Sequence, residues 1–100
     1  MDHGRRTMSD REYIDSLLPR AHEAAAKAMR KYPTPNYTVA KVAEEAGEVV
    51  RGAIHFAEGR MPWPEVEGEI VQLLAMLIRL TTEGDQTIGM APPFASKDTP

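Results

Sequence analysis

Apolar residues recur at three- and four-residue spacing through three segments of the chain, and this pattern is the feature that most constrains the fold. Such spacing places apolar side chains on one face of an α-helix. Two proline-containing stretches, "YPTPNYT" and "EGRMPWP", separate the three segments, and prolines in such stretches interrupt helices. No segment shows the sustained alternation of a half-buried strand. The sequence therefore predicts an all-α protein, a helical bundle with three main helices per chain.

The ends of these helices carry local signals. Ser9 opens the sequence of a capping box, "SDRE", so the first helix is predicted to begin directly after it. Pro19 either kinks this helix or lies in the first turn of a new one. Thr38 can cap the second helix, and Gly59 lies near its C-terminus. The third helix is predicted over about residues 64–83.

One hundred residues make one domain with a modest core. We assign residues 9–85 to this domain, residues 1–8 to a polar tail and residues 86–100 to a proline-containing tail. The formal net charge of −3 argues against a nucleic-acid polymer as partner, because proteins that bind one are usually basic. The absence of cysteine excludes disulfides and cysteine-based zinc sites.

The N-terminal stretch "MDHGRRTMSD" is polar and lacks the apolar segment of a signal peptide. The longest apolar run, around residues 70–80, is too short and too interrupted to span a membrane. We therefore expect a cytoplasmic protein with no membrane partner.

Carboxylates interrupt the apolar patterns of the second and third helices. At about 100° per residue, Glu44, Glu45 and Glu48 form one stripe on the second helix, with Glu45 at the edge nearest the apolar side. On the third helix, Glu69 lies inside the edge of the apolar arc, next to Gln72. A carboxylate among leucines is unfavourable unless a cation or another partner accompanies it.

Two such helices packed antiparallel can aim these oxygens at one point. Clustered carboxylates raise each other's pKa unless a cation neutralises them. Oxygen ligands without histidine or cysteine suit Mg²⁺ or Mn²⁺, and Mg²⁺ suits a phosphate-containing substrate. The alternative is a solvated acidic face, which is the usual role of a charged stripe on an amphipathic helix.

The stretches "VAEEAGEVV" and "EIVQLLAMLIRL" resemble the all-α nucleoside triphosphate pyrophosphohydrolases, which include MazG-like proteins, dimeric dUTPases and phosphoribosyl-ATP pyrophosphohydrolases. Their hallmark is E-E-x-x-E on one helix, followed by E-x-x-D at the start of a very apolar helix. The resemblance covers about residues 38–82. Glu69 occupies the glutamate position of the second motif, and Gln72 occupies its aspartate position.

The resemblance implies an enzyme that hydrolyses a nucleoside triphosphate between its α and β phosphates with Mg²⁺, or alternatively Mn²⁺. It implies that Glu45, Glu48 and Glu69 are metal ligands and that Glu44 is a ligand or orients the attacking water. Gln72 departs from the family pattern, because its amide oxygen can bind a metal but brings no charge. The alternative is therefore a weakened or inactive helical module that binds nucleotides or other proteins as an oligomer.

Three polar residues are candidates for contact with the substrate, and each has a plainer alternative. Lys41 can contact phosphate, although an ion pair with Glu45 one turn away is the commoner arrangement. His55 can contact phosphate or a base, although a surface histidine is commoner. Arg79 can contact phosphate or pair with an acid of another subunit, and we favour the second role.

Three aromatic residues, Trp63, Tyr37 and Tyr32, are expected in loops at one end of the helices. An aromatic ring at this place can stack on a nucleobase. The alternative for Trp63 is a buried position that fills the core, as is usual for tryptophan.

The apolar arc of the third helix covers about 220°, which is too wide for a helix packed on one side only. We therefore expect a homo-oligomer, a dimer or a tetramer, in which two copies of this helix complete a four-helix-type core. Such an arrangement would also bring Arg79 or aromatic residues of one subunit to the acidic site of the other.

Overall fold

The computed structural model describes residues 8–33 and 37–93. It contains three long helices and one short 3₁₀ helix: α1 (Asp10–Lys31), α2 (Thr38–Ala57), α3 (Trp63–Glu83) and η1 (Gln86–Ile88). The only strand-like feature among the described residues is a single antiparallel bridge between Asp85 and Met90. The prediction of an all-α chain with three main helices is thus confirmed. None of the helices described is long and apolar enough to cross a membrane.

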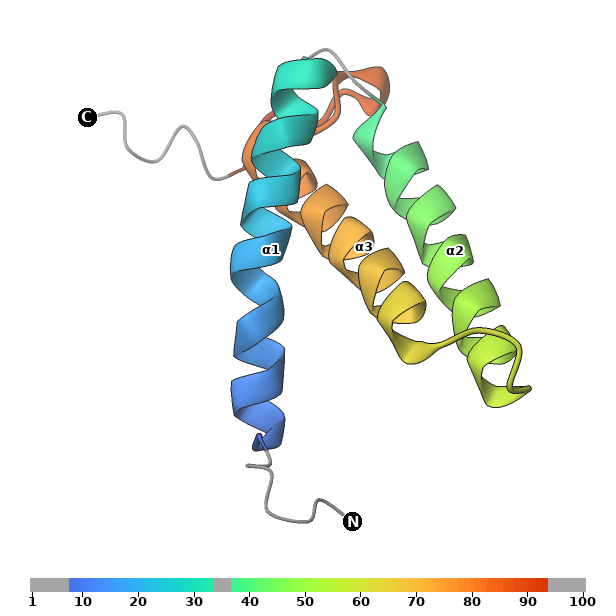
Figure 1. The fold of residues 1–100 in the computed structure, drawn as a ribbon. Coiled ribbons are helices and arrows are strands. Elements are labelled where there is room, and N and C mark those ends of the chain that lie inside the picture. Colours follow the sequence, from blue (N-terminus) through green and yellow to red (C-terminus); the bar gives the residue numbers. More distant parts are fainter. Residues whose placement is uncertain (1–7, 34–36, 94–100) are drawn as a thin grey trace.

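The central helix is α3, which packs against α1 on one side and α2 on the other (Figure 1). The helices α1 and α2 come closest near the top of the view and diverge below it (Figure 1). The overall dimensions are 54 × 30 × 20 Å.

Local signals account for most helix ends. The Ser9 side chain accepts a hydrogen bond from the Glu12 N–H at 3.1 Å, and the Glu12 carboxylate accepts one from the Ser9 N–H at 2.9 Å. This capping box confirms the predicted start of α1. Pro19 lies inside α1, which continues through it as one helix. Gly84 ends α3 with a φ of 69°, a backbone conformation that favours glycine.

The start of α2 differs from the prediction. Thr38 is the first residue of the helix and its side chain caps nothing. The cap comes instead from Asp85, whose carboxylate accepts a hydrogen bond from the Val39 N–H at 2.8 Å. Asp85 is buried and also accepts hydrogen bonds from the N–H and hydroxyl of Thr87. Residues just after α3 thereby fix the first turn of α2.

Two contact regions hold the helices together. Between α1 and α3, the buried residues Leu17, Ala21 and Val71 form a core against which larger apolar residues pack. Between α2 and α3, Gly52 is buried, and a side chain there would contact Val66 at 3.6 Å. This is an ordinary van der Waals distance, so α2 and α3 pack closely at Gly52 with room for a small side chain.

Candidate functional site

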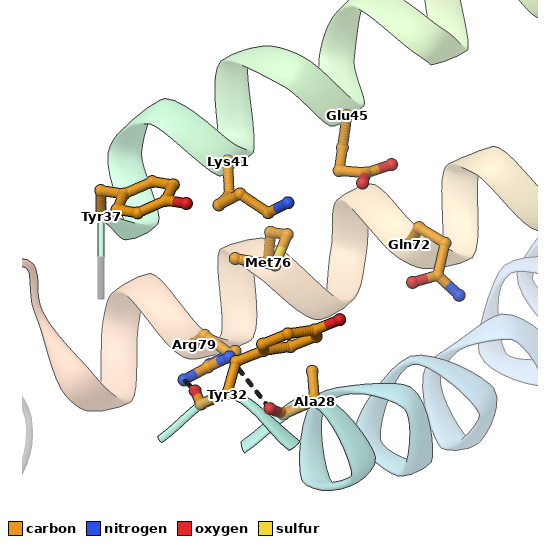
Figure 2. A pocket seen from close by; sticks show the side chains of 8 residues that line it. All are labelled: Ala28, Tyr32, Tyr37, Lys41, Glu45, Gln72, Met76 and Arg79. Atoms are coloured by element: carbon orange, nitrogen blue, oxygen red, sulfur yellow. Dashed lines mark hydrogen bonds between the residues drawn. The ribbon is translucent and has the colours of Figure 1, made fainter. Parts of the chain in front are cut away.

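A cavity of about 260 Å³ lies where the end of α1, the first half of α2 and the middle of α3 meet (Figure 2). Its lining combines two tyrosines with charged, amide and apolar side chains: Ala28, Tyr32, Tyr37, Lys41, Glu45, Gln72, Met76 and Arg79. A volume of this order approaches that of small-molecule sites, which begin near ~300 Å³. Four of the residues expected from the sequence to act at a site thus line one cavity: Lys41, Glu45, Gln72 and Arg79.

Glu45 and Gln72 extend from α2 and α3 at the same end of this cavity (Figure 2). Partial burial raises the pKa of Glu45, and the negative charge of Glu69 raises this pKa further, whereas Lys41 lowers it. The structure therefore brings the carboxylates of both acidic motifs within electrostatic reach of each other. A half-buried carboxylate within electrostatic reach of a second one is a place where a cation is stabilising.

The other two acids of the first motif are more exposed. Glu44 pairs with Lys41 at 3.1 Å, and this hydrogen bond raises the pKa of Lys41. Glu48 pairs with Arg51 at 3.5 Å. The ion pair expected between Lys41 and Glu45 is thus replaced by one with Glu44. Exposed pairs of this kind contribute little, about 0–1 kcal/mol, so both carboxylates can exchange their partners for a ligand.

In the part of the chain that the structure describes, no three Asp, Glu or His side chains stand close enough to hold a metal ion. The oxygen atoms at the cavity edge nevertheless have the chemistry that Mg²⁺ prefers. Glu45 and Gln72 line the cavity and offer a carboxylate and a neutral carbonyl oxygen, and Glu69, which is not part of its lining, lies within electrostatic reach of Glu45. Mg²⁺ usually keeps several waters and takes one or two carboxylates, so oxygen ligands of this kind suit the ion in their chemistry.

Arg79 has a structural partner at each of its hydrogen-bonding nitrogens. Its guanidinium contacts both carboxylate oxygens of Glu83, at 3.0 and 2.8 Å, and also the carbonyl oxygens of Ala28 and Tyr32, at 3.3 and 2.7 Å. Arg79 is 1% exposed. The acid that we expected from another subunit is therefore Glu83 of the same helix. Arg79 fixes the end of α1 and thereby the wall of the cavity.

The three aromatic residues do not share one end of the helices, so that part of the prediction was wrong. Tyr32 and Tyr37 line the cavity, close to the connection between α1 and α2. Trp63 opens α3 at the other end of α2, where its indole N–H donates to the Tyr13 hydroxyl at 2.9 Å and its ring meets the edge of Phe56. It is 37% exposed rather than buried in the core.

His55 also lies toward the Trp63 end of α2 and is half-buried. It contributes to none of the cavity walls described above. Of the residues expected to contact substrate, the structure thus brings Lys41 and Arg79 to the cavity and leaves His55 and Trp63 away from it.

Sequence reasoning missed a polar network that holds α1 against α3. The Tyr13 hydroxyl donates to Glu67 at 2.6 Å, and Arg20 contacts the other carboxylate oxygen at 2.7 Å. The bond between Tyr13 and Glu67 lowers the pKa of Glu67 and raises that of Tyr13. These residues lie up to 54 positions apart in the sequence, so no local pattern links them.

Met76 and Ala28 complete the cavity, although the sequence marks them only as parts of an apolar pattern. The sequence thus indicates this region through its acidic motifs and through the candidate contacts Lys41, Arg79, Tyr32 and Tyr37, but not through Met76 or Ala28. Comparison of the chain with protein-family models, with curated proteins and with solved structures finds no match.

Proposed function

We propose that the protein is a Mg²⁺-dependent nucleotide pyrophosphohydrolase. The reaction adds water across the bond between the α and β phosphates of a nucleoside triphosphate and yields the monophosphate and pyrophosphate. One observation carries the proposal: Glu45, at the wall of the cavity, has its pKa raised by burial and by the charge of Glu69 on the neighbouring helix. A bound cation would remove both penalties.

The residues at the cavity have distinct roles in this proposal. Glu45 and Glu69, with the amide oxygen of Gln72, hold the metal, and Glu48 joins them by leaving its exposed pair with Arg51. Bound there, Mg²⁺ or alternatively Mn²⁺ would neutralise charge on the phosphates and would help to form or orient the attacking hydroxide. Glu44 is a further ligand or orients the water.

Lys41 and the tyrosines provide the contacts beyond the metal. The Lys41 ammonium lines the cavity and pairs with Glu44 in an exposed contact, from which it can turn to a phosphate oxygen. Tyr32 and Tyr37 offer aromatic faces for the base. The proposed enzyme acts as a homo-oligomer, a dimer or a tetramer, in keeping with the wide apolar arc of α3.

A second candidate function is a non-catalytic helical module that binds nucleotides or proteins. The ion pairs of Glu44 with Lys41 and of Glu48 with Arg51 favour it, because both carboxylates already have cationic partners. The neutral Gln72 favours it too. Calorimetry with Mg²⁺ and a non-hydrolysable nucleotide distinguishes the two functions. Tight binding that depends on the metal favours the enzyme, whereas the absence of binding at millimolar Mg²⁺ favours the non-catalytic module.

The decisive experiment is release of pyrophosphate from a panel of canonical and modified nucleoside triphosphates with Mg²⁺ or Mn²⁺. We expect Glu48→Gln and Glu69→Gln to abolish turnover while the helix content by circular dichroism is unchanged, because each removes one charge and keeps the shape. Glu58→Gln is the matched control, since Glu58 pairs with Arg60 just beyond α2 and should retain full activity. Turnover retained in both site variants would refute the assignment of the metal ligands.

A further inference from the structure

A second cavity lies beside the first, against the C-terminal part of α1. It has a volume of about 230 Å³ and is lined by Ala24, Lys27, Ala28, Lys31, Tyr32 and Gln72. We call it the lysine cavity. It shares three of these residues, Ala28, Tyr32 and Gln72, with the cavity that carries Glu45. The Gln72 amide extends from α3 toward α1, so it separates the two cavities (Figure 2).

Neither cavity is large on its own. Small-molecule sites have volumes of about 300–1,000 Å³. The volumes of about 260 and 230 Å³ each fall below this range, whereas the two cavities together fall within it. A ligand that needs a site of ordinary size would therefore extend through both.

Small residues of α1 make room for the lysine cavity. Ala24 and Ala28 are four residues apart and lie on the same side of the helix. The same spacing places Lys27 and Lys31 in a row beside them, and both lysines are exposed. The alanines thus form the floor of the cavity, and the lysines form one rim.

The two lysines have no carboxylate to neutralise them. Like charges four residues apart weaken a helix. Neither lysine forms an ion pair with any residue that the structure describes. Glu23 precedes Lys27 by four residues, the order that favours such a pair, but the two do not pair although the structure describes both. Two positive charges at the rim of one cavity therefore remain available to an anionic ligand.

The chemistry of this rim suits a phosphate group. Lysine binds phosphate as a compact point charge with three donors. The Lys31 ammonium lies 5.5 Å from the centre of the Tyr32 ring, a cation–π contact that holds it at the cavity wall. Two ammonium groups within one cavity suit an anion with several charges better than an anion with one.

We propose that the lysine cavity binds the β and γ phosphates of the substrate and holds them as pyrophosphate after hydrolysis. This inference rests on the proposed function, which assigns the metal to the Glu45 end of the neighbouring cavity. Gln72 lines both cavities, so a triphosphate that passes this residue has its last two phosphates beside Lys27 and Lys31. The monophosphate product lacks these two phosphates and makes no contact with the lysines.

Calorimetry with inorganic pyrophosphate tests the lysine cavity, without metal and at low salt, because salt screens exposed charges. We expect the wild-type chain to bind pyrophosphate, and Lys27→Gln with Lys31→Gln to weaken this binding at least about tenfold. Lys27→Arg with Lys31→Arg should retain binding, because both charges remain. The matched control is Arg11→Gln with Arg30→Gln, which also removes two positive charges from exposed positions of α1, but outside both cavities. It should bind as the wild type does.

A turnover assay gives a second measurement. The variant with both lysines changed to glutamine should raise the KM for the nucleoside triphosphate and the inhibition constant of pyrophosphate by the same factor. Inhibition by the nucleoside monophosphate should not change.

The absence of binding by the wild-type chain at millimolar pyrophosphate would overturn the inference. So would equal binding by the wild type and the glutamine variant of the lysines, or an equal loss in the arginine control. If pyrophosphate binding depends on the lysines but no nucleotide is hydrolysed, the cavity is supported and only the enzyme is refuted. Turnover in a chain whose pyrophosphate binding ignores the lysines refutes the cavity and leaves the enzyme.

Discussion

Arg79 is the buried charge on which the end of α1 depends, and its replacement is the sharpest test of the described packing. Arg79→Met keeps most of the side-chain volume and removes every hydrogen bond of the guanidinium. The change leaves Glu83 without its cationic partner at a side-chain exposure of 14%, and leaves the carbonyl oxygens of Ala28 and Tyr32 without this donor.

The expected loss follows from these partners. Removing one member of a buried ion pair costs about 3–5 kcal/mol, because the other charge stays behind without compensation. Since Glu83 retains some contact with water, we expect the lower end, about 3 kcal/mol. Total stabilities of small domains are about 5–15 kcal/mol, and 1 kcal/mol shifts Tm by roughly 4–8 °C at this size. The variant should therefore melt at least about 12 °C below the wild type.

Urea unfolding followed by circular dichroism measures this loss at one fixed protein concentration. The matched control is Arg11→Met, which removes an exposed pair with Asp15 at 3.5 Å and should cost less than about 1 kcal/mol. The double change Arg79→Met with Glu83→Leu should recover part of the loss, because it removes the stranded charge. A loss below about 1 kcal/mol for Arg79→Met, equal to that of the control, would refute the structural role of Arg79.

Three further predictions concern other parts of the fold and the site. Gly84→Ala should lower the free energy of unfolding in urea by more than about 2 kcal/mol, because Gly84 has a φ of 69° and the new side chain would also clash with the Met90 carbonyl oxygen. Gly59→Ala should cost about half of that, because Gly59 has a φ of 74° but no neighbour near its Cβ position. Hydrogen bonds from Thr87 and Val39 hold the pKa of Asp85 below its usual value of 3.8. The stability that Asp85 adds to the folded state is therefore complete above pH 3.8 and is lost as pH falls through the lower pKa of the folded state. Asp85→Asn should accordingly be less stable than the wild type at pH 7, with a difference that shrinks below pH 3.8; a constant difference would contradict this account. Gln72→Asp should tighten Mg²⁺ binding about tenfold in calorimetry by adding a charged ligand, and weaker binding would mean that the second motif is misaligned.

The helices were predictable because their signals are local. Each signal acts within a few residues of the helix end that it sets. These signals are the capping box at Ser9, the breaker stretches and the glycines after α2 and α3. The end of α3 at Gly84 needs only the backbone freedom of that glycine. The all-α fold class follows from such signals without knowledge of which helices pack against each other.

The partners across the fold were not predictable in the same way. Arg79 shares a face with polar residues, and nothing in the sequence shows that it reaches the end of α1. Trp63 was grouped with Tyr32 and Tyr37, because the two connections between helices look alike as breaker segments. Tyr32 follows α1 and Tyr37 precedes α2, so both lie near the start of α2, whereas Trp63 begins α3 beyond the other end of α2.

The site was predictable in part. Glu45 and Gln72 were expected together from their positions on two helices, and the cavity contains both. The direction in which α2 turns its apolar residues was not expected. Periodicity identifies an apolar side of a helix, but in the structure Val50 and Ile54 on that side are 59% and 52% exposed, whereas Gly52 is buried beside Val66.

The cap that Asp85 provides for α2 has a consequence for the order in which the chain acquires its shape. A ribosome completes α2 well before it adds Asp85, so the growing chain has an α2 whose first turn lacks its acceptor. The carboxylate also accepts hydrogen bonds from Thr87, which is added later still. The first turn of α2, which carries Lys41, therefore gains its cap only after Asp85 has been added. The cavity is thus one of the last parts of this fold to form during synthesis, and a chain stopped before Asp85 would have helices without a finished site.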